Sequence, residues 1–136
     1  MNYQKLFITS LCLLTYMGMM AQTVKVISPD GKLQVSIVCE KGHASYSVNY
    51  DGKSMVTPSA LGLKADIGDF TKGLTLKDSK ESRVDRTYTM TRTKASTSHF
   101  VANQLDVNFE NKEGLTMMVT FLVANNDVAF RYTLQT

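Results

Sequence analysis

The stretch LTMMVTFLV, residues 115–123, decides the fold, because it is apolar on both faces of a β-strand. Successive side chains of a strand point to opposite faces. One face therefore carries four apolar side chains, namely Met117, Val119, Phe121 and Val123. The other face carries Met118 and Leu122. A strand with one face in water has polar residues on that face, so this stretch predicts a central strand, or a strand that something else covers.

Four other stretches alternate apolar and polar residues, which is typical of strands with one face on a core: 33–37, 46–50, 105–109 and 128–132. Turn-forming residues lie between the runs, at 29–31, 51–52, 113–114 and 125–127. No stretch after residue 22 repeats apolar residues with the period of a helix. The sequence therefore predicts an all-β fold, an antiparallel β-sandwich.

Two polar segments interrupt this pattern. The stretch 66–82 is rich in Lys and Asp, and we interpret it as a long connection with weak strand character at Leu74 and Leu76. Residues 94–98 have the composition of a surface loop. A turn or two of helix is expected only around Ser59 and Ala60, or between Ser79 and Glu81.

The first 21 residues predict a signal peptide. Lys5 supplies a positive charge, and a short apolar run follows from Leu6 to Leu14. This run is too short for a membrane span, which needs about 20 apolar residues. Cleavage is expected after Ala21, and Cys12 lies inside the apolar run rather than at a lipid-attachment site. We therefore predict a signal peptide over 1–21 and a domain over 22–136, exported to the periplasm or outside the cell.

Charge and cysteine content exclude several classes of protein. The formal net charge of +3 falls by one, to +2, when the segment with Lys5 is removed. Basic residues are spread singly between acidic neighbours, so no cluster predicts binding to nucleic acid. The domain contains one cysteine, Cys39, and an internal disulfide is not possible.

No residue set in the chain predicts a catalytic, cofactor-binding or metal site. Cys39 and His43 have the spacing of two metal ligands, but a structural zinc site needs four, and the only other histidine is His99. No nucleophile signature surrounds Cys39. Glycoside hydrolysis needs two carboxyl groups that flank one bond. The acidic residues of one region alternate with Lys and Arg, which is typical of a solvated surface: Asp66, Asp69, Asp78, Glu81 and Asp85.

Aromatic residues could form a platform that stacks on sugar rings, but the chain contains no Trp, the strongest platform. Most Tyr and Phe residues have the phase of inward-facing side chains. We therefore predict that seven of them belong to the core: Tyr46, Tyr50, Tyr88, Phe109, Phe121, Phe130 and Tyr132.

The order of several motifs resembles the start of glycoside hydrolase family 97. An export signal that ends at Ala21 is followed by SPDGKL (28–33), YSVNYDGK (46–53) and PSALGL (58–63). NQL (103–105) and NNDVAFRY (125–132) are similar to later strands of that family's N-terminal domain. The sequence departs from the family pattern at Ala102, where an aromatic residue is usual, and at Gln104, where Glu is frequent.

The resemblance implies an exported enzyme family that acts on α-linked sugars as α-glucosidases or α-galactosidases, with a bound calcium ion. Its members have an N-terminal β-supersandwich followed by a (β/α)8 catalytic barrel that holds the catalytic carboxylates. The chain ends at Thr136 before any barrel, so the resemblance implies a partial supersandwich without a catalytic residue or a cofactor of its own. Its implied partners are the barrel and, through it, an α-linked oligosaccharide.

Two alternatives stay open at this point. The chain could be a free-standing exported module that binds carbohydrate or a surface. An enzyme with its own site between Asp66 and Asp85 is the third hypothesis, and the alternation of charges there disfavours it.

Overall fold

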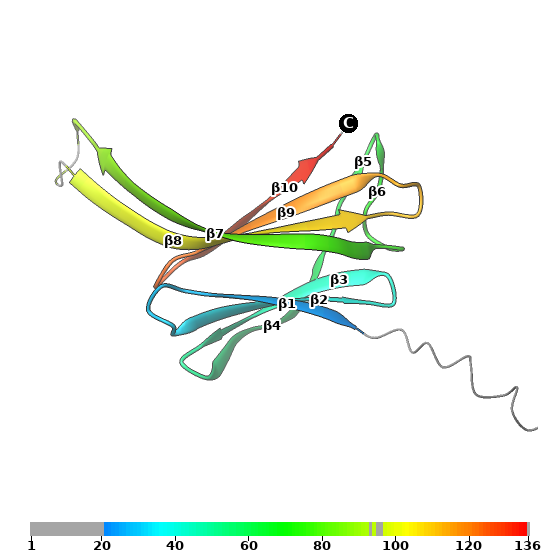
Figure 1. The fold of residues 1–136 in the computed structure, drawn as a ribbon, viewed down its shortest axis with the longest axis horizontal. Coiled ribbons are helices and arrows are strands. Elements are labelled where there is room, and N and C mark those ends of the chain that lie inside the picture. Colours follow the sequence, from blue (N-terminus) through cyan, green and yellow to red (C-terminus); the bar gives the residue numbers. More distant parts are fainter. Residues whose placement is uncertain (1–20, 93, 95–96, 136) are drawn as a thin grey trace, which may run out of the picture.

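The computed structural model describes residues 21–92, 94 and 97–135, and these form two stacked antiparallel β-sheets (Figure 1). The first sheet has the order β1-β2-β3-β4, with bounds Gln22–Ile27, Leu33–Glu40, His43–Tyr50 and Lys53–Leu61. The second has the order β10-β9-β8-β7, with bounds Val128–Leu134, Thr116–Val123, Thr97–Glu110 and Thr75–Thr89. A small hairpin, β5 (Lys64–Ala65) and β6 (Gly68–Asp69), connects the sheets. The predicted antiparallel β-sandwich is confirmed.

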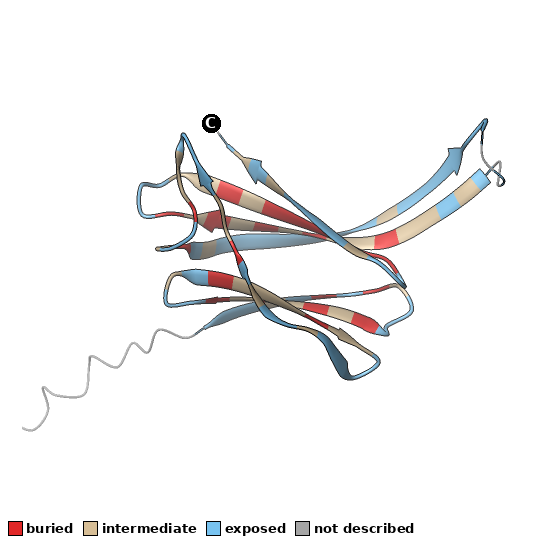
Figure 2. Ribbon diagram, turned by 180° about the vertical axis from the view of Figure 1, so that it is seen from behind, coloured by how far each residue is buried: buried red, intermediate tan, exposed pale blue. Residues whose placement is uncertain are grey.

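The alternating runs form the core between the sheets, as Figure 2 shows by the buried segments that face each other. Val35 and Ile37 of β2 and Val107 and Phe109 of β8 are completely buried. The stretch 115–123 contains β9, which pairs with β8 on one side and β10 on the other. Its inward side chains are likewise completely buried: Met117, Val119, Phe121 and Val123. The prediction of a central strand is therefore confirmed.

The predicted turns lie between strands. Asp51 and Gly52 have φ values of 49° and 78°, the left-handed conformation of a tight hairpin turn. Asp30 lies in the turn between β1 and β2, where its side chain accepts hydrogen bonds from the Ser28 hydroxyl (2.6 Å) and the Lys32 N–H (3.0 Å). The Asp30 N–H donates to Asn125 Oδ1 (3.0 Å) in the β9–β10 connection. This turn therefore joins the two sheets at one end of the sandwich.

The interpretation of residues 66–82 as a long connection is wrong from residue 75 onward, and the strand character predicted at Leu76 is confirmed. Residues 75–89 form β7, a single 15-residue strand that pairs with β8 along its length. β7 is an edge strand, and most of its side chains are exposed on both faces. Its sequence therefore lacks apolar alternation, and backbone pairing with β8 holds it in place. Phe70 and Leu74, which precede it, are buried in the core.

The expected helical turns are also wrong, because residues 59–60 lie in β4 and residues 79–81 lie in β7. Of the surface loop expected over 94–98, Thr97 and Ser98 belong to β8. The predicted signal peptide lies, over 1–20, outside the described residues. Within the residues that the structure does describe, no helix is long and apolar enough to cross a membrane.

The Asp30 carboxyl group predicts a measurable pH dependence. Its hydrogen bonds, first from Ser28 and then from the Lys32 backbone, hold its pKa below the ordinary value of 3.8. A lowered pKa in the folded state stabilises the fold above the unfolded-state pKa, and this contribution is lost as the pH falls through the folded-state pKa. We expect Asp30→Asn to lower the melting temperature at neutral pH and to differ progressively less from the wild type below about pH 3.8.

Thermal melts of both proteins across this acid range measure the difference. A melting-temperature gap that stays constant from neutral pH into acid would show that the Asp30 charge contributes nothing.

Candidate functional site

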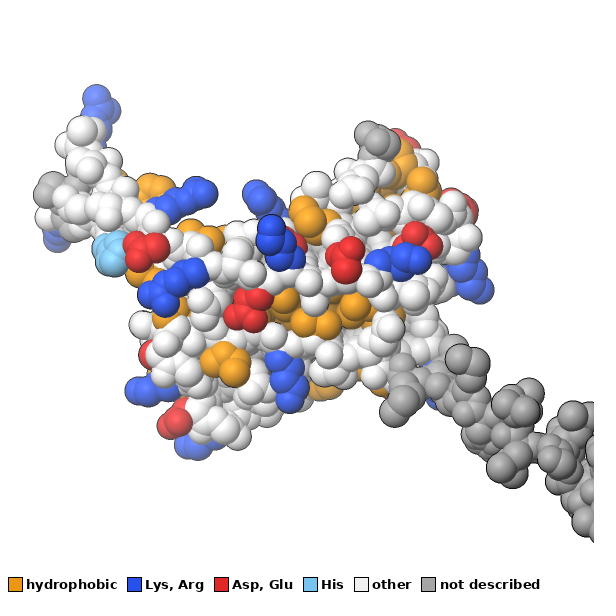
Figure 3. Space-filling view, viewed as in Figure 1, with side chains coloured by type: hydrophobic (Ala, Val, Ile, Leu, Met, Phe, Trp, Pro, Cys, Tyr) orange, Lys and Arg blue, Asp and Glu red, His pale blue; other side chains and the backbone are white. Residues whose placement is uncertain are grey.

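The outer face of the second sheet is hollowed, and this hollow is the candidate functional site. It has a volume of about 270 Å³ and is lined by residues from all four strands. We call it the trough, and its lining is Val84, Arg86, Tyr88, Phe100, Gln104, Thr120, Leu122, Ala129, Phe130 and Arg131. Figure 1 shows its origin, since the ends of β7 and β8 curve away from the sandwich as an arm. In Figure 3, basic side chains project into the hollow above the sheet from both sides.

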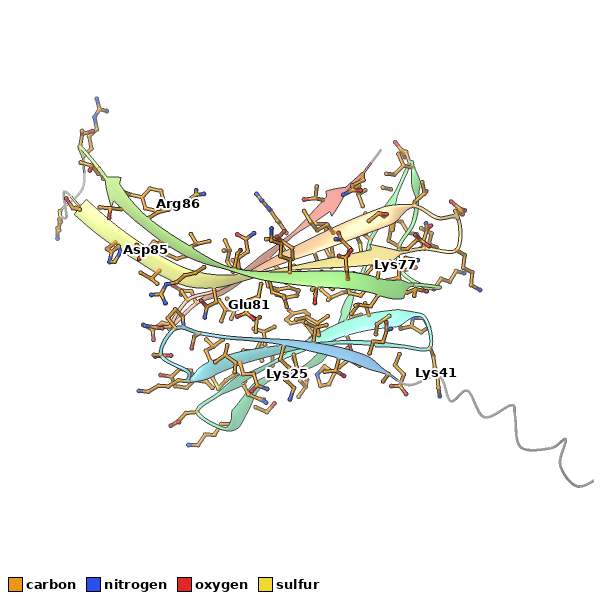
Figure 4. All side chains as sticks on the ribbon, in the orientation of Figure 1. Lys25, Lys41, Lys77, Glu81, Asp85 and Arg86 are labelled. Atoms are coloured by element: carbon orange, nitrogen blue, oxygen red, sulfur yellow. The ribbon has the colours of Figure 1, made fainter. Side chains whose placement is uncertain are left out.

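Strand register explains how the lining comes together. Leu122 of β9 pairs with Gln104 of β8 on one side and with Ala129 of β10 on the other. Arg86 of β7 pairs with Phe100 of β8. Figure 4 shows Arg86 on the concave side of the arm, with the neighbouring Asp85 on the other side. Apart from Phe130, the lining therefore consists of the alternate residues of each strand that do not face the core.

Two aromatic residues of the lining are exposed. Tyr88 is 46% exposed and Phe130 is 39% exposed. The prediction that they belong to the core is wrong for both. Tyr88 faces away from the core, in phase with Arg86, and Phe130 lies on the edge strand β10, although its ring packs on Tyr46. The same prediction is confirmed for Phe109 and Phe121, which are completely buried. The three other tyrosines, Tyr46, Tyr50 and Tyr132, are half-buried and pack against the core.

The polar groups of the trough are partly engaged already. The Thr120 hydroxyl is buried and donates to Asp106 Oδ1 (2.7 Å). The Gln104 amide donates to both carboxylate oxygens of Asp106 (3.1 Å each). By contrast, Arg86 and Arg131 have no carboxylate within ion-pair distance among the described residues. The guanidinium groups of Arg86 and Arg131 are thus the charged groups of the trough lining, and neither has an ion-pair partner among the described residues.

The acidic residues considered for hydrolysis do not converge. Asp69 binds the Thr71 hydroxyl and backbone, which lower its pKa, and it also lies 3.7 Å from Lys64 Nζ. Asp85 contacts His99 at 2.6 Å. Asp78 accepts a hydrogen bond from Asn108 (2.6 Å). These side chains are spread along β6 and β7, so they form no pair that could flank one glycosidic bond.

Cys39 and His43, which have the spacing of two metal ligands, do not form a metal site either. Cys39 lies in the core and pairs with Ala44, whereas His43 is exposed and pairs with Glu40. The Cys39 thiol donates to the Leu74 carbonyl (3.5 Å), and burial raises its pKa. A raised pKa keeps the thiol neutral and unreactive. Cys39 is therefore a packed core residue.

Calcium, which the family resemblance implies, needs six to eight oxygen ligands. Over residues 21–92, 94 and 97–135, no three His, Cys, Asp or Glu side chains lie close enough to hold a metal ion together. These residues do not fit a calcium site by themselves.

The sequence does not single out Arg86, Phe100 or Arg131. The one signal for their face of the sheet is the second apolar face of the stretch 115–123, with Met118 and Leu122. That signal indicates a covered strand but does not indicate which strands surround it, because the polar sequence of β7 is typical of a connection.

Several solved structures share this fold. A β-arabinopyranosidase is similar with a TM-score of 0.80 and 44% sequence identity, covering 85% of this chain and 18% of that chain. A glycoside hydrolase family 97 enzyme from Pseudoalteromonas sp. strain K8, in complexes with panose and with acarbose, is similar with a TM-score of 0.76 and 24% identity. That match covers 82% of this chain and 17% of the other. The chain thus spans less than a fifth of the length of these enzymes.

No curated protein matches the chain. The family described as Glycosyl-hydrolase 97 N-terminal matches residues 26–136, which include nine of the ten strands completely and part of β1. The chain therefore belongs to the glycosyl-hydrolase 97 N-terminal family.

Proposed function

We propose that this chain is the N-terminal domain of an exported glycoside hydrolase, that it packs on a catalytic domain, and that it shapes one wall of the carbohydrate-binding cleft. The family match over residues 26–136 carries this proposal. A structural role agrees with the structure, because Asp69 and Asp85, two of the acidic residues considered for hydrolysis, each bind a different neighbour, Lys64 and His99. In this proposal the domain alone does not hydrolyse glycosides.

The substrate of the whole enzyme is proposed from its relatives. The 44% identical structure is a β-arabinopyranosidase, and the 24% identical enzyme is bound to panose or acarbose in its complexes. We propose a pyranoside substrate, with an α-linked oligosaccharide as the expected class. Calcium is proposed for the whole enzyme, with ligands that come mainly from outside the described residues. Export to the periplasm or the cell exterior is proposed from the signal-peptide pattern of residues 1–21.

A domain exchange tests the proposal. The matching segment of the β-arabinopyranosidase is replaced by residues 22–136 of this chain, and we call the product the chimera. We expect the chimera to fold and to hydrolyse p-nitrophenyl β-arabinopyranoside with a kcat/KM within about tenfold of the parent, because a correctly packed domain preserves the geometry of the cleft. A control in which the segment is deleted should lose activity. A chimera as inactive as the deletion would contradict the proposal.

The second candidate function is a free-standing module that binds carbohydrate. The exposed ring of Tyr88 in the trough favours it, since an exposed aromatic ring can stack on a sugar. Binding of the 136-residue chain to panose, titrated by calorimetry, tests it. Saturable binding that Tyr88→Ala abolishes would favour the module, and no heat of binding would favour the structural domain.

A further inference from the structure

We propose that the trough on the outer face of β7–β10 is the docking surface for the catalytic domain, and that it receives a segment of that domain with apolar side chains flanked by carboxylates. This inference rests on the proposed function and names the surface that performs it. The two outer faces of the sandwich differ in composition, and this difference is the first observation that supports it.

The outer face of the first sheet has the composition of a solvated surface. Its residues are mostly polar: Lys25, Gln34, Ser36, Ser45, Ser47 and Asn49. The outer face of the second sheet also carries polar residues, among them Lys80, Asp106 and Asn108, but around the trough it carries Val84, Phe100 and Leu122. These side chains are half-buried, and the exposed rings of Tyr88 and Phe130 lie beside them in the trough. Apolar surface that is gathered on one face and rimmed by polar groups marks an interaction site. Of these two faces, the second is therefore the one suited to burial against another surface.

The charges on this face indicate what covers it. Arg86 and Arg131 come from the two edge strands, β7 and β10, and both line the trough. Lys77, which also lies on β7, has Glu110 at 3.3 Å. Neither trough arginine has such a neighbour among the described residues. Asp106, the carboxylate that Gln104 and Thr120 bind, is not within ion-pair distance of either arginine. Burying an unpaired charge is costly, so a covering surface with carboxylates opposite both guanidinium groups fits this face.

The composition of the trough suits a protein surface. Each sugar hydroxyl that is buried needs a hydrogen-bond partner. The Thr120 hydroxyl and the Gln104 amide already donate to Asp106, and the aliphatic side chains of the lining offer no polar atoms. The donors that remain are the Tyr88 hydroxyl and the guanidinium groups of Arg86 and Arg131, which come from the two edge strands. Tyr and Arg side chains around an apolar centre are instead the composition of protein interface hot spots. The catalytic domain of the same enzyme is the occupant that the family membership provides, because the solved relatives extend well beyond the matched segment.

The experiment uses the chimera defined above. We expect the double substitution Arg86→Glu and Arg131→Glu to lower kcat/KM by about tenfold or more and to separate the unfolding of the two domains in calorimetry, because like charges then face each other. The matched control is Arg83→Glu with Lys25→Glu, which changes the net charge equally at exposed positions outside the trough. This control should retain the activity and the single transition of the chimera.

A second pair of substitutions separates docking from a folding defect. Arg86→Lys with Arg131→Lys keeps both positive charges and avoids the repulsion that Glu introduces, so it should retain most of the activity that the Glu variant loses. If the Glu variant behaves as the control does in an active chimera, the trough is not the docking surface, although the proposed function stands. If it keeps full activity but no longer binds panose, the trough is a sugar site and the docking inference is overturned. An unmodified chimera without activity contradicts the proposed function itself.

Discussion

Phe121→Ala is expected to lower the free energy of unfolding by about 3–5 kcal/mol, which is the usual cost of removing a completely buried Phe side chain. Phe121 lies in the inner strand β9 and is 0% exposed. Its ring lies 5.9 Å from Tyr46 of the other sheet and 5.3 Å from Phe130 of the neighbouring strand, measured between centroids. The substitution therefore leaves a cavity at the contact between the two sheets, and urea denaturation followed by circular dichroism measures its cost.

Phe130→Ala is the matched control for this prediction. Phe130 pairs directly with Phe121 and its ring lies 5.2 Å from Tyr46, but it is 39% exposed because β10 is an edge strand. We expect a loss of about 1–2 kcal/mol, smaller than the cost at Phe121. Equal costs at the two positions would show that β10 is covered and that the sandwich has another edge.

Gly62→Ala is the second substitution with a large expected effect, about 3 kcal/mol or more. Gly62 has φ = +143°, a conformation that residues with a side chain rarely adopt. A Cβ atom there would lie 2.5 Å from the Phe70 carbonyl oxygen. The backbone cannot easily yield, because the Phe70 side chain is completely buried and its N–H donates to the Leu63 carbonyl (2.9 Å). The Gly62 N–H also donates to the Tyr132 hydroxyl (3.1 Å), a bond that links the residue after β4 to β10.

Gly31→Ala provides the comparison, since Gly31 has φ = +78° and no atom lies within 4 Å of the position that a Cβ would occupy. Its expected cost is the conformational penalty alone, about 1–2 kcal/mol. Both variants are measured by the same urea denaturation. A cost at Gly62 no larger than that at Gly31 would mean that the backbone at residue 62 lies farther from the Phe70 carbonyl than it does in the structure.

The strands with one face on the core are predictable from the sequence, and the edge strand β7 is not. Inner strands such as β9 and β8 must bury one face, so their apolar residues recur every second position. β7 buries almost nothing, and its position depends on backbone hydrogen bonds to β8 that any sequence can make. Phe70 cannot be recognised as a core residue for a related reason, because it stands alone in a polar segment and reaches the core through a turn.

The candidate site is less predictable than the fold, because it depends on β7. Arg86 and Phe100 are 14 residues apart in the chain, and they meet only because the β7–β8 hairpin is in the register that pairs them. The phase predicted for Phe130 is correct, since it lies on the same side as Phe121. Its exposure follows from the order of the strands, which alternation alone does not reveal. Arg86 and Arg131 can be recognised as a pair only when it is known that β7 and β10 are the two edges of one sheet.

The central claim is that this domain serves a glycoside hydrolase, and reading the coding DNA beyond the codon for Thr136 tests it most directly. We predict that the coding sequence continues, in the same frame or after a frame correction, and that it encodes the alternating strands and helices of a barrel with acidic residues at strand ends. A stop codon with no such sequence in any frame would contradict the claim, and the free-standing module would then be the better account.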